Sequence, residues 1–278
     1  MVMYSHSRLS TFEQCPYRYK LRYIDKIKPE VEKSIEAHLG TCVHDTLEWL
    51  YIEVKKGKIP TIDDAITYYS EKWQNEFKPS FIIVKKEFTA KDYFEKGVKF
   101  LLGYYVKHTP FQDGTLELEK RIFIKLTEEH KLIGFIDRLS YNKEKNRYEV
   151  HDYKTANTLP TQAKMDEDRQ LALYSIAIKE LYGLEKEVAL IWHYLAHDTI
   201  IESFRTNEEL SQLKESTINL IKTIETAMEY PTKKCILCNW CEYKSMCPEF
   251  GGTIKTKEPK EKQVSLDNYP TLKKYIND

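Results

Sequence analysis

The spacing of apolar residues changes its period along the chain, from helical to strand-like and back. The first hundred or so positions fit helices, and an apolar stripe predicts one at about 41–56, formed by Val43, Leu47, Leu50 and Val54. Two further helices are predicted at about 61–77 and 90–107. Ser10 and Glu13 have the spacing of a capping box, and Pro16 is expected to divide a short turn from a helix.

A period of two follows, which is typical of a strand with one buried face. It is carried by even-numbered apolar residues, namely Leu116, Leu118, Ile122, Ile124 and Leu126. Further strands are predicted at about 131–140, 147–154, 188–195 and 199–204, with helices at about 160–181 and 208–229. The middle of the chain therefore has the order β-β-β-α-β, with helices on both sides.

The composition is that of a globular protein, with 41% hydrophobic and 31% charged residues. No apolar run reaches the length of a membrane helix, and the N-terminal segment has no apolar core of a secretory signal, so we expect a cytoplasmic protein. Lys and Arg balance Asp and Glu at 43 each, so the net charge does not favour a nucleic-acid partner. Local basic patches, such as six basic residues within the first 28, are still enough to hold a phosphate backbone.

Two aspartates stand at the ends of neighbouring predicted strands. Asp152 and Lys154 share one face because side chains alternate, and Tyr153 points away. If the strand that ends near Asp137 pairs with this one, both carboxylates meet at one edge of the sheet. Such hard oxygen ligands suit Mg²⁺ or Mn²⁺, and Lys154 can orient an attacking water or offset charge in the transition state. An Asp-x-Lys triplet on its own is equally a surface ion pair.

Three more polar residues accompany these carboxylates. His44 stands in Gly40-Thr-Cys-Val-His44 at the start of a predicted helix, where a histidine can be a metal ligand or a hydrogen-bonded boundary residue. Gln170 and Tyr174 lie four positions apart and so share a helix face. Both can donate hydrogen bonds to phosphate or hold the lysine in place. The pair can equally be a surface glutamine beside a core tyrosine.

Four of the six cysteines fall within thirteen positions, which calls for a metal or a cluster. They are Cys235, Cys238, Cys241 and Cys247. From spacing alone, one zinc ion held by these four thiolates is the simpler interpretation. Cys42 is expected to be a small buried hydrophobe.

These motifs together resemble the PD-(D/E)XK nuclease superfamily and, within it, the RecB/AddB branch. The resemblance runs from about Ser5 to Pro248. The motifs follow the family order, namely Gly-x-x-x-His ending at His44, Gly134-Phe-Ile-Asp137, His151-Asp-Tyr-Lys-Thr155 and Gln170-x-x-x-Tyr174. The fold that the resemblance implies is α/β, a restriction-endonuclease-like mixed β-sheet flanked by helices.

The resemblance also implies a different use of the cysteines. Cluster-containing members of the branch, including the CRISPR-associated four-cysteine exonucleases, place one cysteine near the N-terminus and three near the C-terminus. Cys15 matches the first, and the triplet matches Cys238, Cys241 and Cys247, with Cys235 as an additional cysteine outside the pattern. The implied [4Fe–4S] cluster would join the N- and C-terminal segments.

The resemblance implies the following roles and organisation. His44, Asp137 and Asp152, with the backbone carbonyl of Tyr153, would bind Mg²⁺ or Mn²⁺, while Lys154, Gln170 and Tyr174 would complete the catalytic set. We expect a mainly helical region with His44 and the first cluster cysteine at 1–110, a catalytic core at 111–205, a C-terminal helix with the cysteine segment at 206–250, and a polar tail at 251–278.

The expected function is a DNA nuclease, most readily an exonuclease on single-stranded DNA or DNA ends, in repair, recombination or CRISPR-type DNA processing. The chain contains no Gly-x-x-x-x-Gly-Lys-Ser/Thr loop, so helicase, recombination or integrase proteins are the expected partners. Two alternatives stay open, a non-catalytic module that binds DNA ends and a zinc-containing interaction protein.

Overall fold

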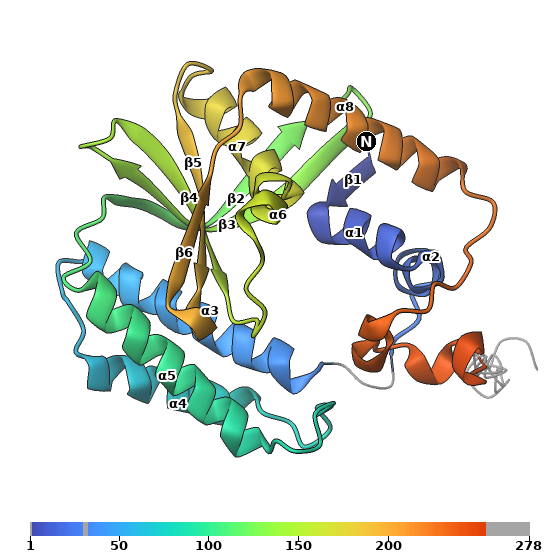
Figure 1. The fold of residues 1–278 in the computed structure, drawn as a ribbon, viewed down its shortest axis with the longest axis horizontal. Coiled ribbons are helices and arrows are strands. Elements are labelled where there is room, and N and C mark those ends of the chain that lie inside the picture. Colours follow the sequence, from blue (N-terminus) through green and yellow to red (C-terminus); the bar gives the residue numbers. More distant parts are fainter. Residues whose placement is uncertain (1, 30–32, 254–278) are drawn as a thin grey trace, which may run out of the picture.

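The structure is a computed structural model that describes residues 2–29 and 33–253. Its strands form one six-stranded mixed sheet, and Figure 1 shows α3, α4 and α5 packed together on one side of it and α8 running along the other side. The strands are β1 (Val2–Ser5), β2 (Thr115–Lys125), β3 (His130–Asn142), β4 (Arg147–Lys154), β5 (Val188–Tyr194) and β6 (Thr199–Ser203). The α-helices are α1 (His6–Gln14), α2 (Pro16–Tyr19), α3 (Ile35–Lys55), α4 (Ile62–Glu76), α5 (Ala90–His108), α6 (Gln162–Asp166), α7 (Arg169–Tyr182) and α8 (Asn207–Thr226).

The central strand β3 has three partners. β2 runs antiparallel along one of its edges. The other edge is shared, because β1 pairs with it in parallel from His130 to Ile133 and β4 pairs with it antiparallel from Arg138 to Asn142. β5 then lies parallel to β4, and β6 antiparallel to β5. Two different strands therefore share this edge of β3. The stretch of β3 between Ile133 and Arg138 borders the gap between β1 and β4, which we call the fork.

Each side of the sheet has its own core. The side of α7 and α8 buries aliphatic residues such as Ile136, Val150 and Ile221. The side of α3, α4 and α5 is richer in aromatic residues and includes Tyr69 and Tyr153. This two-layer burial explains the continuous apolar run of β5, whose residues are all buried.

The helix boundaries differ from the sequence prediction at three places. α3 begins at Ile35, not near 41, because Ser34 caps it by accepting a hydrogen bond from the Ala37 amide. The capping box at Ser10 is wrong, since Ser10 lies inside α1 and Ser5 is the cap. The helix predicted at about 160–181 is two helices, because Asp168 caps a new one by accepting from the Leu171 amide.

The strand predictions need two corrections. β1 was not predicted, since four residues are too few for a periodic signal. In β2 the alternation holds at Ile122 and Ile124, which are buried, but Leu116 is exposed. Between these two parts, Glu119 has a positive φ of 43°, which interrupts the regular pleat. The other predicted elements agree within a few residues, and most of the predicted 251–278 tail lies outside the described residues.

Candidate active site and cysteine pocket

The predicted carboxylates lie at the fork of the sheet. The last pair that β3 and β4 form on this side is Arg138 with His151. Asp137 and Asp152 are the next residues on the two strands, where the strands begin to separate. The Asp137 carboxylate (Oδ2) accepts a hydrogen bond of 2.9 Å from the backbone amide of Tyr153, which ties the two strand ends together.

Asp152, Lys154 and Gln170 form one polar group on the α7 side of the fork. The Lys154 ammonium lies 2.6 Å from the Asp152 carboxylate. Gln170 donates from Nε2 to Asp152 at 3.3 Å and accepts from Lys154 at 3.4 Å. The Tyr174 ring lies beside Gly134 of β3, on the same helix face as Gln170. The structure therefore brings the predicted α7 pair to the two charged groups of β4.

His44 reaches the fork from α3 on the other side. Its Nε2 lies 2.7 Å from the Tyr153 carbonyl, and its Nδ1 lies 3.3 Å from the Asp137 carboxylate. The imidazole thus contacts two other predicted metal ligands, the Asp137 carboxylate and the Tyr153 carbonyl.

Glu119 is a further carboxylate that sequence reasoning missed. Leu118 pairs with Arg138 and Lys120 with Ile136, so Glu119 stands opposite Asp137 across the two strands. Ligand atoms of His44, Glu119 and Asp137 all lie within 4.8 Å of one another. One imidazole and two carboxylates at this separation suit a divalent cation. The sequence gives no direct signal for this, since Glu119 lies in an apolar-polar strand where an exposed glutamate is ordinary.

The charges at the fork shift the proton affinities of these groups. Burial, and next the charge of Asp152, raises the pKa of Asp137 to about 6, although His44 and the Tyr153 amide oppose this. Partial burial and the charge of Asp137 raise the pKa of Glu119 to about 7. Burial disfavours the Lys154 ammonium, but Asp152 outweighs it and the pKa of Lys154 is raised. Crowded carboxylates of this kind repel one another, and a cation bound between them offsets that repulsion. The residues therefore fit the expected metal.

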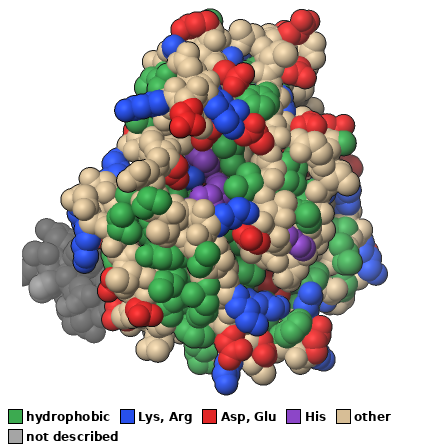
Figure 2. All heavy atoms as spheres, turned by 60° about the vertical axis from the view of Figure 1, so that its left-hand side comes forward, with side chains coloured by type: hydrophobic (Ala, Val, Ile, Leu, Met, Phe, Trp, Pro, Cys, Tyr) green, Lys and Arg blue, Asp and Glu red, His purple; other side chains and the backbone are tan. Residues whose placement is uncertain are grey.

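A buried polar network holds Tyr153 from the far side of the sheet. Its hydroxyl accepts a hydrogen bond of 3.0 Å from Arg138 Nε and lies 3.2 Å from the Tyr104 hydroxyl. Arg138 is 1% exposed and forms an ion pair with Asp113. Next to this network, His193 lines a pocket between α5 and β6, and Figure 2 shows histidine side chains at the bottom of a hollow in the surface. Because Tyr153 is held so firmly, its backbone is fixed where it meets Asp137 and His44.

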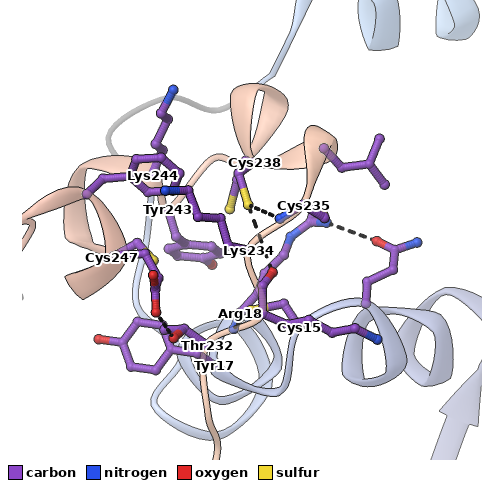
Figure 3. Close-up of a pocket in the computed structure, with 16 residues that line it drawn as sticks. Cys15, Tyr17, Arg18, Thr232, Lys234, Cys235, Cys238, Tyr243, Lys244 and Cys247 are labelled. Carbon is purple, nitrogen blue, oxygen red and sulfur yellow. Dashed lines mark hydrogen bonds between the residues drawn. The ribbon is translucent and has the colours of Figure 1, made fainter.

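The predicted cluster cysteines line one pocket although they come from opposite ends of the chain. Cys15, between α1 and α2, faces the segment that holds Cys238, Cys241 and Cys247 (Figure 3). Cys235 lines the same pocket and is exposed.

Amide donors and cationic side chains stand beside these thiols. The Arg18 amide donates to Cys15 Sγ at 3.5 Å, and the Cys235 amide donates to Cys238 Sγ at 3.3 Å. Arg18, Lys234 and Lys244 also line the pocket. Amide donors and cations of this kind stabilise sulfur ligands that carry negative charge. Cys42 is elsewhere, fully buried in α3 as predicted.

Comparison with known proteins identifies the family. The family model described as the PD-(D/E)XK nuclease superfamily matches residues 3–248. The chain belongs to this superfamily. Membership supports a nuclease function and implies metal-dependent hydrolysis of phosphodiesters, with DNA as the substrate. The matched range contains the forked sheet apart from Val2 of β1, together with the carboxylates and the cysteine segment.

Two solved structures are similar to this chain at low sequence identity. A "Putative exonuclease" from Eubacterium rectale is 13% identical, with 86% of each chain covered and a TM-score of 0.48. The structure of SSO0001 is also 13% identical, covering 87% of this chain and 95% of its own, with a TM-score of 0.36. A search of curated proteins found no match. In the part of the chain that the structure describes, no helix has both the length and the apolar character needed to span a membrane.

Proposed function

We propose that this nuclease is an exonuclease acting on single-stranded DNA or DNA ends. The observation that carries the proposal is the fork of the sheet, where Asp137 and Asp152 stand beside a histidine and a protonated lysine. A non-catalytic end-binding module would not need this combination. The RecB/AddB-like motifs add support for free ends as the site of attack.

The metal position follows from the donors at the fork. His44, Asp137 and Asp152, the Tyr153 carbonyl and, in addition, Glu119 would hold Mg²⁺ or Mn²⁺. When bound, the ion polarises the scissile phosphate and lowers the pKa of a coordinated water.

The remaining residues act on the phosphate and the water. Lys154 stays protonated, so it offsets negative charge that develops on the phosphoryl oxygens and orients the attacking water. Gln170 holds Lys154 and Asp152 in place through its two hydrogen bonds. Tyr174 lies on the same face of α7, where its hydroxyl meets Gln170 and the main chain of Phe135, so it helps to hold Gln170 beside Lys154.

The test is a digestion of end-labelled single- and double-stranded DNA with Mn²⁺. We expect Asp152→Ala and Lys154→Ala each to lower the rate at least about 100-fold, as expected when a group that stabilises the transition state is removed. Lys91→Ala, an exposed lysine on α5, is the matched control and should digest at the wild-type rate. Equal digestion by all four proteins would assign the activity to a contaminant. Release of mononucleotides from one end, without internal cuts, would identify an exonuclease.

We also propose a [4Fe–4S] cluster bound by Cys15, Cys238, Cys241 and Cys247. The pocket that joins these thiols, with its amide donors and cations, supports the proposal. In the described part of the chain no three cysteine sulfurs lie within 4.8 Å of one another, whereas thiolates on one tetrahedral zinc are about 3.8 Å apart. A larger cluster therefore suits the pocket better. Anaerobically purified protein should be brown and contain iron, and a colourless protein with one zinc would contradict the proposal.

The pathway and partners are part of the same proposal. We propose that the nuclease acts beside a helicase, a recombination protein or an integrase. Repair, recombination and CRISPR-type DNA processing all present the free ends that such an enzyme would digest.

A further inference from the structure

The face of the sheet that carries Asp137 continues past the metal ligands as an exposed surface. Side chains on β2 and β3 alternate, and Ile122, Ile124 and Ile136 are buried against α7 and α8. The residues between them therefore point to the opposite side, where Phe123 is 46% exposed and Phe135 is 50% exposed. Exposed rings of this size beside an active site are a feature that burial does not explain.

Register arranges these residues in rows that start at the metal site. Glu119 stands opposite Asp137, Arg121 pairs with Phe135, Phe123 with Ile133, and Lys125 with Lys131. We call the last six residues, Arg121, Phe123, Lys125, Lys131, Ile133 and Phe135, the β2–β3 face. From Asp137 to Lys131 the strand covers about 20 Å.

The charge of this face is positive. It contains one arginine and two lysines and no acidic residue. The Arg121 guanidinium lies over the Phe123 ring, 4.8 Å from its centroid, while Lys125 forms an ion pair with Glu128 at the far end. The acidic residues of these rows are Glu119 and Asp137, at the metal end.

We propose that the β2–β3 face binds single-stranded DNA and leads it to the metal site. The inference rests on the proposed function and specifies which surface receives the substrate. Aromatic rings stack on bases of any sequence, and cations between them hold the phosphates, the combination used for single strands. A duplex keeps its bases stacked on each other, so it cannot offer their faces to Phe123 and Phe135.

The test is a binding titration of fluorescein-labelled oligothymidylate in EDTA, followed by anisotropy. Phe123→Ala with Phe135→Ala should weaken binding about ten-fold or more. Arg121→Ala should lower the slope of log affinity against log salt by about 0.7, as loss of one phosphate contact requires. Phe204→Ala removes a ring that is 42% exposed after β6 and should bind as wild type. A labelled duplex should bind more weakly and respond little to loss of the rings.

A second variant separates stacking from simple apolar contact or misfolding. Phe135→Leu keeps an apolar side chain and should lose binding, whereas Phe135→Trp should keep it, with thermal unfolding confirming that both are folded. Wild-type affinity in the double alanine variant would overturn the proposal. Because binding is measured without metal, the two proposals can fail separately. If the wild type digests DNA but the double alanine variant binds as wild type, only the role of the β2–β3 face is contradicted. If binding depends on the two rings but the wild type does not digest DNA, only the nuclease assignment is contradicted.

Discussion

Asp137 has neighbours that change its proton affinity in opposite directions. Burial and Asp152 favour the protonated carboxyl, while the Tyr153 amide and His44 favour the carboxylate. The result is a pKa of about 6 in the folded protein, against 3.8 for an unperturbed aspartate. The metal-free fold is therefore less stable when Asp137 is charged.

This cost gives a pH-dependent prediction for Asp137→Asn. A raised pKa means that the folded state binds the proton more tightly, so wild-type stability falls as pH rises from about 4 to about 6 and stays low above that. Asn removes the cost, so above pH 6 the metal-free variant should be more stable by about 3 kcal/mol. Below pH 4 the two proteins should be alike. Urea unfolding in EDTA measures this, and a difference that persists at low pH would contradict it.

Glu119 gives a second prediction at the residue scale. Its carboxylate lies with the Asp137 carboxylate and the His44 imidazole in one ligand group. Glu119→Gln should weaken Mn²⁺ binding about ten-fold in isothermal titration calorimetry, because a charged ligand is replaced by a neutral one. Glu117→Gln, on the same strand, is the matched control. Binding should also weaken below pH 7, as protons compete for Glu119, whose pKa is about 7 without metal. Unchanged affinity in Glu119→Gln would remove it from the site.

At the scale of elements, β3 and α7 approach most closely at Gly134. A Cβ atom there would lie 2.8 Å from Cζ of the Tyr174 ring, too close for a real contact. Gly134→Ala should therefore force the helix and strand apart and lower stability by about 2 kcal/mol. Gly103→Ala in α5 meets no neighbour and should be neutral or slightly stabilising. When Tyr174→Leu is added to Gly134→Ala, it should restore part of the lost stability, as measured by urea unfolding. If the two substitutions change the stability additively, the two positions do not interact.

The sequence predicted most elements from local patterns, and local patterns together with the order of the family motifs predicted which side chains the fork brings together. Periodicity located β4, α4 and α5, and alternation placed Asp152 beside Lys154. What it missed depends on partners distant in sequence. β1 is a strand only because β3 has a free edge, and Glu119 joins the candidate ligands only through its register with Asp137.

At the scale of the whole molecule, the two ends of the chain meet at the cysteine pocket. Arg18 forms an ion pair of 2.7 Å with Glu242, and the Tyr243 hydroxyl donates to the Ile27 carbonyl at 2.9 Å. This pair is bidentate and its side chains are only 25% and 17% exposed, so it helps to hold the two ends together. A covalent cluster through Cys15 would close a loop of more than two hundred residues and stabilise the fold far more.

The cluster proposal predicts a large loss on breaking that link. Cys15→Ser should remove the colour and lower stability by about 5 kcal/mol, by analogy with other cross-links that close long loops. Cys235→Ala, at the exposed additional cysteine, should keep iron and stability. Iron analysis together with thermal unfolding measures both. Full iron content in Cys15→Ser, or loss of iron in Cys235→Ala, would change the ligand set.

The position between Asp152 and Lys154 has a consequence for what its side chain can do. Residue 153 meets the fork through its main chain, with the amide on Asp137 and the carbonyl beside His44. Nineteen amino acids supply the same carbonyl and amide, and only proline lacks the hydrogen. The Tyr153 side chain therefore acts on the fork only indirectly, by holding this main chain in place through Arg138 and Tyr104.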